Sequence, residues 1–199
     1  MIGIIDYGAG NLHSIKNALD YLGLKNRLVK DEKGLKNMER IILPGVGAFG
    51  AAITKLKKIE LLERLIEWLK ADKPYLGICL GLQLLFESSE EAEGVSGFGI
   101  LKGRMRKFQM SKIPQIGWNS VEVIKPSPIL KSQSKKVYFY FLHSYYLDTP
   151  EEEIVLGRTE YGVSYPSVIN KGNIYAVQFH PEKSGKVGLD LLKRWVELC

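Results

Sequence analysis

The segment of the chain best suited to chemistry is Gly77-Ile78-Cys79-Leu80-Gly81, in which glycines stand two residues before and two residues after a cysteine. An apolar, strand-like run precedes the cysteine and a helix-like run follows it. This spacing is typical of a nucleophile elbow, a strained turn between strand and helix in which larger flanking side chains would clash. Backbone N–H groups and the dipole at the start of the helix would favour the reactive thiolate. The alternative interpretation is a buried apolar cysteine without a chemical role.

A nucleophilic cysteine needs a base, and the chain has three histidines, His13, His143 and His180. His180 is the best placed, because it follows the apolar run 174–179 and α/β sheets present catalytic groups at the C-terminal ends of their strands. Glu182 comes two residues later, and in an extended backbone it would point to the same side as His180. A carboxylate there would fix the tautomer and orientation of the imidazole. Taken alone, a His-Pro-Glu tripeptide is more often a surface turn.

A third feature is the glycine-rich loop Pro44-Gly45-Val46-Gly47, which follows the apolar run 41–43. If that run is a strand next to the one before Cys79, the loop lies beside the elbow. One N–H from the loop and the N–H of Leu80 would then form an oxyanion hole for a tetrahedral intermediate. The alternative is a plain turn between a strand and a helix.

The start of the chain carries a competing motif. Gly8-Ala9-Gly10 follows one expected strand and Asp31 follows the next, which imitates a dinucleotide-binding fingerprint. His13 stands where close packing in that motif needs glycine or alanine, which argues against a nicotinamide cofactor. The histidines and cysteines also lack the spacing of metal ligands. The sequence therefore predicts neither a cofactor nor a metal site.

These groups require a scaffold that brings strand ends together. We expect strands at 2–5, 27–29, 41–43 and 75–78, and helices at 12–22, 49–58, 60–71 and 80–88. Short, continuously apolar strands that alternate with helices predict a parallel sheet covered on both faces.

After Gly94 the pattern changes to β-rich segments separated by turn residues. These segments are 98–108, 115–124, 136–147, 154–160, 164–170 and 173–179, with a hairpin signal at Asn170-Lys171-Gly172-Asn173 and a final helix over about 184–198. The sequence thus predicts an α/β fold: a central, mostly parallel sheet flanked by helices, with an antiparallel extension, in one domain spanning residues 1–199.

Composition limits the classes of protein. The chain is 45% hydrophobic and 25% charged, as in globular domains, and its net charge of +6 comes from dispersed residues, which argues against nucleic-acid binding. Two cysteines, Cys79 and Cys199, indicate a reducing compartment rather than a disulfide framework. Because no signal-peptide pattern or bilayer-spanning apolar run is present, we expect a cytoplasmic protein that binds no membrane.

Several motifs resemble those of the class I (triad) glutamine amidotransferases, and more narrowly the glutaminase subunits of imidazole glycerol phosphate synthases. The motifs that carry the resemblance are PGVGAFG from Pro44, GICLGLQLLF from Gly77, QFHPEKS from Gln178, IGWN from Ile116, FLHSYY from Phe141 and DYGAGN from Asp6. These matches are spread along most of the length of the chain. The resemblance implies the flavodoxin-like fold of these amidotransferases.

The resemblance also implies roles for individual residues. Cys79, His180 and Glu182 would form a catalytic triad that hydrolyses glutamine to glutamate and ammonia through a cysteine thioester. The oxyanion hole would involve Val46, Gly47 and Leu80; glutamine would contact Gly45, Gln83, Ser144 and Tyr145; and a protein interface would contain Asn11, Trp118, Tyr140 and Lys183. Trp118 as a buried core aromatic is an equally open interpretation, and Gln83, Ser144 and Tyr145 could be ordinary helix and strand residues.

The expected partner is a barrel-fold cyclase subunit, joined to this chain in a heterodimer. That subunit would use the ammonia to make imidazole glycerol phosphate and aminoimidazole carboxamide ribotide in L-histidine biosynthesis. Three alternatives stay open: the amidotransferase subunit of another biosynthetic synthase, an unrelated elbow-type cysteine hydrolase, and a binding module whose catalytic site has decayed.

Overall fold

A computed structural model describes residues 1–8, 10–110, 112–130 and 136–198. Its centre is a sheet whose first half is parallel. The parallel strands lie in the order β2 (Asn26–Val29), β1 (Ile2–Ile5), β3 (Arg40–Gly45), β4 (Tyr75–Cys79) and β12 (Ile174–Val177). The carboxyl ends of β3, β4 and β12 therefore meet at one edge of the sheet, where the motifs described above begin.

The second half of the same sheet is antiparallel. It continues through β11 (Ser164–Lys171), β10 (Val155–Glu160), β7 (Gln115–Val123) and β8 (Lys136–His143). A small second sheet contains β5 (Ser88–Ser89), β6 (Arg104–Lys107) and β9 (Tyr145–Asp148). The predicted hairpin joins β11 to β12, where Asn170 pairs with Tyr175. The predicted α/β fold with an antiparallel extension is thus confirmed, and the sheet is mixed.

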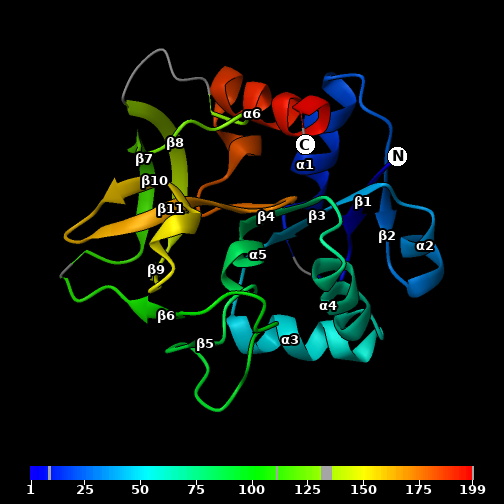
Figure 1. Ribbon diagram of the computed structural model, residues 1–199, viewed down its shortest axis with the longest axis horizontal. Helices are drawn as coiled ribbons and strands as arrows, with labels where there is room; N and C mark the ends of the chain where they lie inside the picture. Colours follow the sequence, from blue (N-terminus) through cyan, green and yellow to red (C-terminus); the bar gives the residue numbers. More distant parts are fainter. Residues whose placement is uncertain (9, 111, 131–135, 199) are drawn as a thin grey trace.

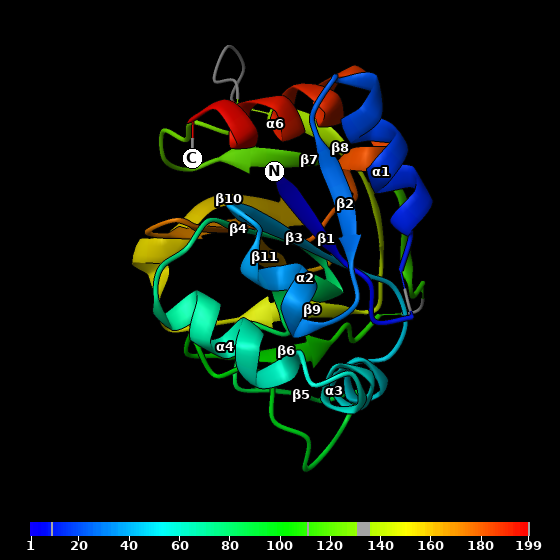
Figure 2. The ribbon, with the colours of Figure 1, turned by 90° about the vertical axis from the view of Figure 1, so that its right-hand side faces the viewer.

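Helices cover both faces of the sheet (Figure 1). One face carries α1 (Leu12–Tyr21) and α6 (Gly185–Leu198), and the other carries α2 (Glu32–Lys36), α3 (Phe49–Lys58) and α4 (Leu62–Lys70), as the turned view also shows (Figure 2). The protein has one hydrophobic core on each face of the sheet. Side chains of β3 point to the two faces alternately: Ile41 and Leu43 pack toward α3 and α4, whereas Ile42 packs toward α1 and α6. No helix in the described ranges is long and apolar enough to cross a membrane.

The helix expected at 80–88 is much shorter. Helix α5 spans Leu80–Gln83 only, and turns follow it. The carbonyls of Leu84, Leu85 and Phe86 accept hydrogen bonds from backbone N–H groups of the loop 97–101 and not from the next helical turn. These three side chains are fully buried, so tertiary packing overrides the helical spacing of the sequence.

Helix α2 was not expected, because five residues are too few for a periodic pattern. Asp31 begins it: its Oδ1 atom accepts a hydrogen bond from the Gly34 N–H at 2.7 Å. Asp31 therefore caps a helix, and Gly10 packs against the β3 backbone, since a Cβ on Gly10 would lie 3.6 Å from the Gly45 Cα. Both observations argue against the dinucleotide fingerprint.

Candidate active site

Cys79 occupies a strained turn between β4 and α5. Its backbone lies at φ 53° and ψ −104°, in the region that non-glycine residues rarely adopt. A Cβ on Gly77 would lie 2.6 Å from the Gly81 carbonyl oxygen, and a Cβ on Gly81 would lie 1.9 Å from the Leu43 carbonyl oxygen. Both flanking glycines are therefore required by close backbone approach, which is the reason the sequence pattern predicts an elbow.

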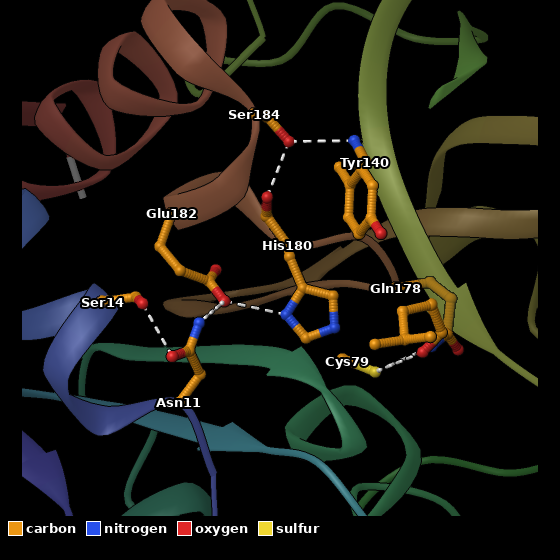
Figure 3. Close-up of polar contacts among 9 residues, drawn as sticks. Asn11, Ser14, Cys79, Tyr140, Gln178, His180, Glu182 and Ser184 are labelled. Atoms are coloured by element: carbon orange, nitrogen blue, oxygen red, sulfur yellow. Dashed lines mark hydrogen bonds and ion pairs between the residues drawn. The ribbon is translucent and has the colours of Figure 1, made fainter. Parts of the chain in front are cut away.

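His180 reaches Cys79 because β12 is the parallel neighbour of β4, with Val177 opposite Ile78. The two chain segments leave the sheet side by side, one into the elbow and the other toward His180. Figure 3 shows the imidazole between the Glu182 carboxylate and the Cys79 side chain. The His180 Nδ1 atom lies 2.8 Å from Glu182 Oε1, and the two side chains are 2% and 1% exposed.

The backbone between His180 and Glu182 is not extended as expected. Residues Pro181–Lys183 form a 3-10 turn, η2, in which the Lys183 N–H bonds to the His180 carbonyl at 3.1 Å. Proline suits the first position of such a turn, since its φ is already correct and its missing N–H is not needed there. The turn folds Glu182 back onto the imidazole, so the predicted contact forms by a different backbone route.

The electrostatic environment favours a protonated His180. Burial by itself would lower its pKa, but the neighbouring Cys79 sulfur and the Glu182 carboxylate raise the pKa of His180 to about 10. The Nε2 atom is buried and without a hydrogen-bond partner among the described residues, as is Glu182 Oε2. The imidazole is thus held between the sulfur and the carboxylate, the order of groups that a nucleophile–base–carboxylate triad requires.

The other two histidines are unsuited to act as the base. His143 is buried, with Nδ1 2.8 Å from the Tyr145 carbonyl and Nε2 3.2 Å from the Tyr165 hydroxyl. Desolvation by burial lowers the pKa of His143 to about 4, against a weaker opposite effect of the Tyr145 carbonyl, so the ring is neutral near pH 7. His13 is exposed on α1.

A pocket of about 360 Å³ lies in front of Cys79, a size suited to a small ligand. It is lined by Val46, Gly47, Ala48, Cys79, Leu80, Gln83, Glu91, Pro114, Leu142, His143, Ser144 and Tyr145. The pocket thus brings together the residues predicted for the oxyanion hole with three of those predicted to contact glutamine. Gly45 is absent from this lining: it is buried, and a Cβ there would lie 2.5 Å from the Tyr7 hydroxyl.

The loop after β3 borders the elbow as expected, because β3 pairs with β4 and Gly45 lies opposite Cys79. Val46 is 38% exposed and Gly47 has φ +108°, a backbone angle that glycine adopts readily. Leu80, the first residue of α5, is buried beside them. The peptide groups of the loop and the N-terminus of α5 therefore border the same pocket as the Cys79 sulfur.

Glu91 is a pocket residue that the sequence did not indicate. Its Oε2 atom accepts a hydrogen bond from the Phe49 N–H at 2.7 Å, at the start of α3. Among the described residues that line the pocket, Glu91 carries the one carboxylate. Its position depends on the long loop between β5 and β6, and no local motif marks it. The described residues contain no cluster of His, Cys, Asp and Glu arranged to hold a metal ion.

The residues predicted for an interface fall into two groups: Asn11 and Lys183 lie next to the triad, and Trp118 and Tyr140 lie on β7 and β8. Asn11 lies at the triad: its Nδ2 atom donates to Glu182 Oε1 at 3.3 Å, and its Oδ1 atom accepts from Ser14 Oγ at 2.7 Å (Figure 3). Trp118 is 58% exposed, which excludes the core interpretation, and it meets Tyr140 edge to face at 6.4 Å between ring centroids. Lys183 is exposed on η2.

A ring of hydrogen bonds ties His180 to β8. The His180 N–H donates to the Tyr140 carbonyl at 2.9 Å, and the Tyr140 N–H donates to Ser184 Oγ at 3.0 Å. Ser184 Oγ in turn donates to the His180 carbonyl at 2.6 Å, as Figure 3 shows. The backbone of the histidine is thereby fixed at both its N–H and its carbonyl.

Comparison with known proteins identifies relatives over the whole length of the chain. The family Glutamine amidotransferase class-I matches residues 3–197. The chain is 48% identical over 199 residues to the imidazole glycerol phosphate synthase subunit HisH of Methanocaldococcus jannaschii, covering 100% of both chains. It is 47% identical over 199 residues to the subunit of the same name from Caldanaerobacter subterraneus, covering 100% of this chain and 98% of that one. A crystal structure of a glutamine amidotransferase shares the fold, with a TM-score of 0.79 at 18% identity over 99% of this chain and 97% of that chain.

Proposed function

Because the chain belongs to the class-I glutamine amidotransferase family, we propose that it is the glutaminase subunit of an imidazole glycerol phosphate synthase in histidine biosynthesis. The observation that carries the proposal is the Cys79, His180 and Glu182 arrangement at the pocket, in a chain whose full-length relatives bear that name. Membership of this family excludes the alternative that the chain is an unrelated elbow-type cysteine hydrolase. The intact triad geometry argues against a decayed binding module.

In the first half of the reaction, the Cys79 thiolate attacks the carboxamide carbon of glutamine. The resulting oxyanion is stabilised by N–H groups of the Val46–Gly47 loop and of Leu80. His180 then donates its Nε2 proton to the amide nitrogen, the C–N bond breaks, and ammonia leaves a glutamyl thioester on Cys79. Glu182 keeps the imidazole oriented by accepting from Nδ1, and Asn11 holds the same carboxylate oxygen.

In the second half, the now neutral His180 takes a proton from water at Nε2. The water oxygen attacks the thioester carbonyl, the C–S bond breaks, and glutamate leaves with regeneration of the thiolate and the imidazolium. The burial of His180 protects this proton transfer from bulk solvent, since the side chain is 2% exposed.

The pocket lining offers contacts for the amino-acid end of glutamine. Gln83, Ser144 and Tyr145 supply neutral polar groups, and the Glu91 carboxylate is suited to the α-ammonium group. Burial raises the pKa of the Tyr145 hydroxyl further above its ordinary value, so it remains a neutral donor at pH 7.

A second subunit is needed to consume the ammonia, and we propose a barrel-fold cyclase bound in a heterodimer. An exposed apolar face on β7 and β8 supports such an interface: Ile116 is 59% exposed, Trp118 58% and Tyr138 59%. Lys183 and Asn11 lie on the η2 and α1 segments next to the triad. A reducing, cytoplasmic compartment belongs to the proposal, because Cys79 is a free thiol.

The proposal is tested with the chain and a barrel-fold cyclase assayed together. We expect glutamine-dependent synthesis of imidazole glycerol phosphate. We expect Cys79→Ala to lower the rate of glutamine hydrolysis by a factor of about 10⁴ or more. The matched control is the same variant supplied with ammonium salt, which should restore synthesis because the cyclase is unaltered. A Cys79→Ala complex that still hydrolyses glutamine, or a wild-type chain that pairs productively with a different synthase only, would refute the proposal.

A further inference from the structure

Gln178 is a buried polar residue to which the mechanism above gives no role. Its side chain is 0% exposed, and it lies directly after β12, two residues before His180. The Nε2 atom donates to Cys79 Sγ at 3.6 Å, and the Oε1 atom accepts from Gln83 Nε2 at 3.3 Å. Figure 3 shows the amide beside the sulfur. Gln178 therefore contacts the nucleophile directly and the pocket through Gln83.

The orientation of the Gln178 amide is determined by its neighbour. Gln83 Nε2 lies 3.5 Å from the Tyr145 carbonyl, which can only accept a hydrogen bond, so Gln83 presents donors on this side. The Gln178 oxygen must face those donors. Its NH₂ group is then left to face Cys79, and the reverse orientation would bring two donors together.

The Cys79 sulfur has two polar neighbours with opposite preferences. The Leu142 carbonyl oxygen lies 3.8 Å from Sγ and can accept from the S–H group, which favours the neutral thiol. The Gln178 N–H donates to the sulfur and favours the thiolate, because a charged acceptor binds an N–H group more strongly than a neutral one. When the Cys79 thiol ionises, it therefore loses the hydrogen bond to the Leu142 carbonyl, and the hydrogen bond from the Gln178 N–H becomes stronger.

We propose that Gln178 is a further catalytic residue, whose side-chain N–H orients the Cys79 sulfur toward the pocket and stabilises its thiolate before glutamine binds. The inference rests on the proposed function, since it concerns the same thiolate. When the C–S bond of the thioester forms, the sulfur loses its charge and the Gln178 contact weakens. When that bond breaks in the second half of the reaction, the contact strengthens again and assists the departure of the sulfur.

Other ionisable groups act on the same sulfur, and all of them are kept when Gln178 is substituted. Those that face Cys79 or its pocket from the surrounding elements are His180, Tyr7, Tyr165, His143, Tyr145 and Glu91. A change in the reactivity of Cys79 on substitution of Gln178 alone is therefore assigned to the lost N–H group.

The test measures alkylation of Cys79 by iodoacetamide as a function of pH in the intact chain, without glutamine or partner. Gln178→Met keeps an unbranched side chain and removes the donor, and we expect alkylation at pH 7 to slow about tenfold with the half-maximal pH raised by about one unit. Gln178→Glu places a carboxylate beside the sulfur and should slow alkylation further. Mass spectrometry locates the label on Cys79.

The matched control is Thr149→Val, which removes another buried hydrogen-bond donor, the one to the Lys102 carbonyl at 2.6 Å, away from the pocket, and should leave the alkylation profile unchanged. Thermal unfolding identifies variants that fold. A Gln178→Met or Gln178→Glu chain that folds and alkylates with the wild-type pH profile overturns the inference, because a merely structural role would lower the unfolding temperature and leave that profile in place. A shifted profile in the Gln178 variants, together with a wild-type chain that hydrolyses no glutamine with its partner, would uphold the role of Gln178 and refute the proposed function.

Discussion

The single carboxylate among the described pocket residues makes Glu91 the side chain that should recognise a cationic amino group. Glu91→Gln keeps an oxygen that can accept from the Phe49 N–H, so the fold should be retained. We expect KM for glutamine to rise about tenfold or more, because a charge-assisted hydrogen bond is lost, with kcat little changed since the amino group is remote from the reacting carbon. Steady-state kinetics of the complex provide the measurement.

Glu93→Gln is the matched control, because Glu93 is exposed on the same loop and does not line the pocket. Wild-type KM in the Glu91 variant would show that the ammonium group is bound elsewhere.

Residues of the candidate site could be predicted from the sequence where a local motif fixes their geometry. The elbow follows from two glycines around Cys79, and the histidine–carboxylate pair follows from a strand end and a turn. Glu91 and Gln178 could not be predicted in the same way. Glu91 reaches the pocket through the packing of a long loop, and Gln178 acts through a contact with a residue 99 positions away in the chain.

At the scale of elements, the close approach of β3 to the elbow makes Gly81 a critical position. In Gly81→Ala the new Cβ would lie 1.9 Å from the Leu43 carbonyl oxygen, a backbone atom of the neighbouring strand that cannot move without the sheet. We expect a loss of about 3 kcal/mol or more in the free energy of unfolding, measured by denaturant titration. Gly50→Ala is the control: its Cβ would meet the Ala92 methyl group at 3.2 Å, and alanine favours helix α3, so little change is expected. Equal stability of the two variants would contradict the role of the close approach.

The elements themselves were predictable where a buried run is short and continuous, as in β1, β3 and β4, or where one helical face is apolar, as in α4. The predicted helix at 80–88 was wrong beyond Gln83, because Leu84–Phe86 are buried on all sides and their carbonyls bond to a distant loop. Helix α2 and strand β5 were not predicted, because they contain five and two residues, too few to show a helical or strand-like pattern of apolar side chains. Contacts between distant segments decide these cases.

At the scale of the whole molecule, the buried His143 should make stability depend on pH. The native chain keeps this ring neutral down to about pH 4, whereas the unfolded chain protonates it below about pH 6.5. The unfolded state therefore binds more protons in this window, and stability falls as pH falls from about 6.5 to about 4, by up to about 3 kcal/mol from this group. In His143→Asn, which can still donate to the Tyr145 carbonyl, that part of the decline should disappear.

Denaturant titrations at several pH values provide the measurement, and His13→Asn, a change at an exposed histidine, should keep the wild-type slope. A His143→Asn chain with an unaltered slope would mean that the ring is protonated in the native state.

The ring of hydrogen bonds through Tyr140 and Ser184 connects His180 to both halves of the sheet. In sequence the histidine follows β12, in the parallel half of the sheet. Its N–H, however, bonds directly to β8, at the far edge of the antiparallel half, and its carbonyl is linked to β8 through Ser184. Any displacement of β8, whose neighbour β7 carries the exposed Trp118, must therefore carry the imidazole with it or break these bonds. Cys79 is tied to β8 only loosely by comparison, through the 3.8 Å contact between its Sγ and the Leu142 carbonyl. A force applied to that outer face would therefore change the separation between the sulfur and the imidazole.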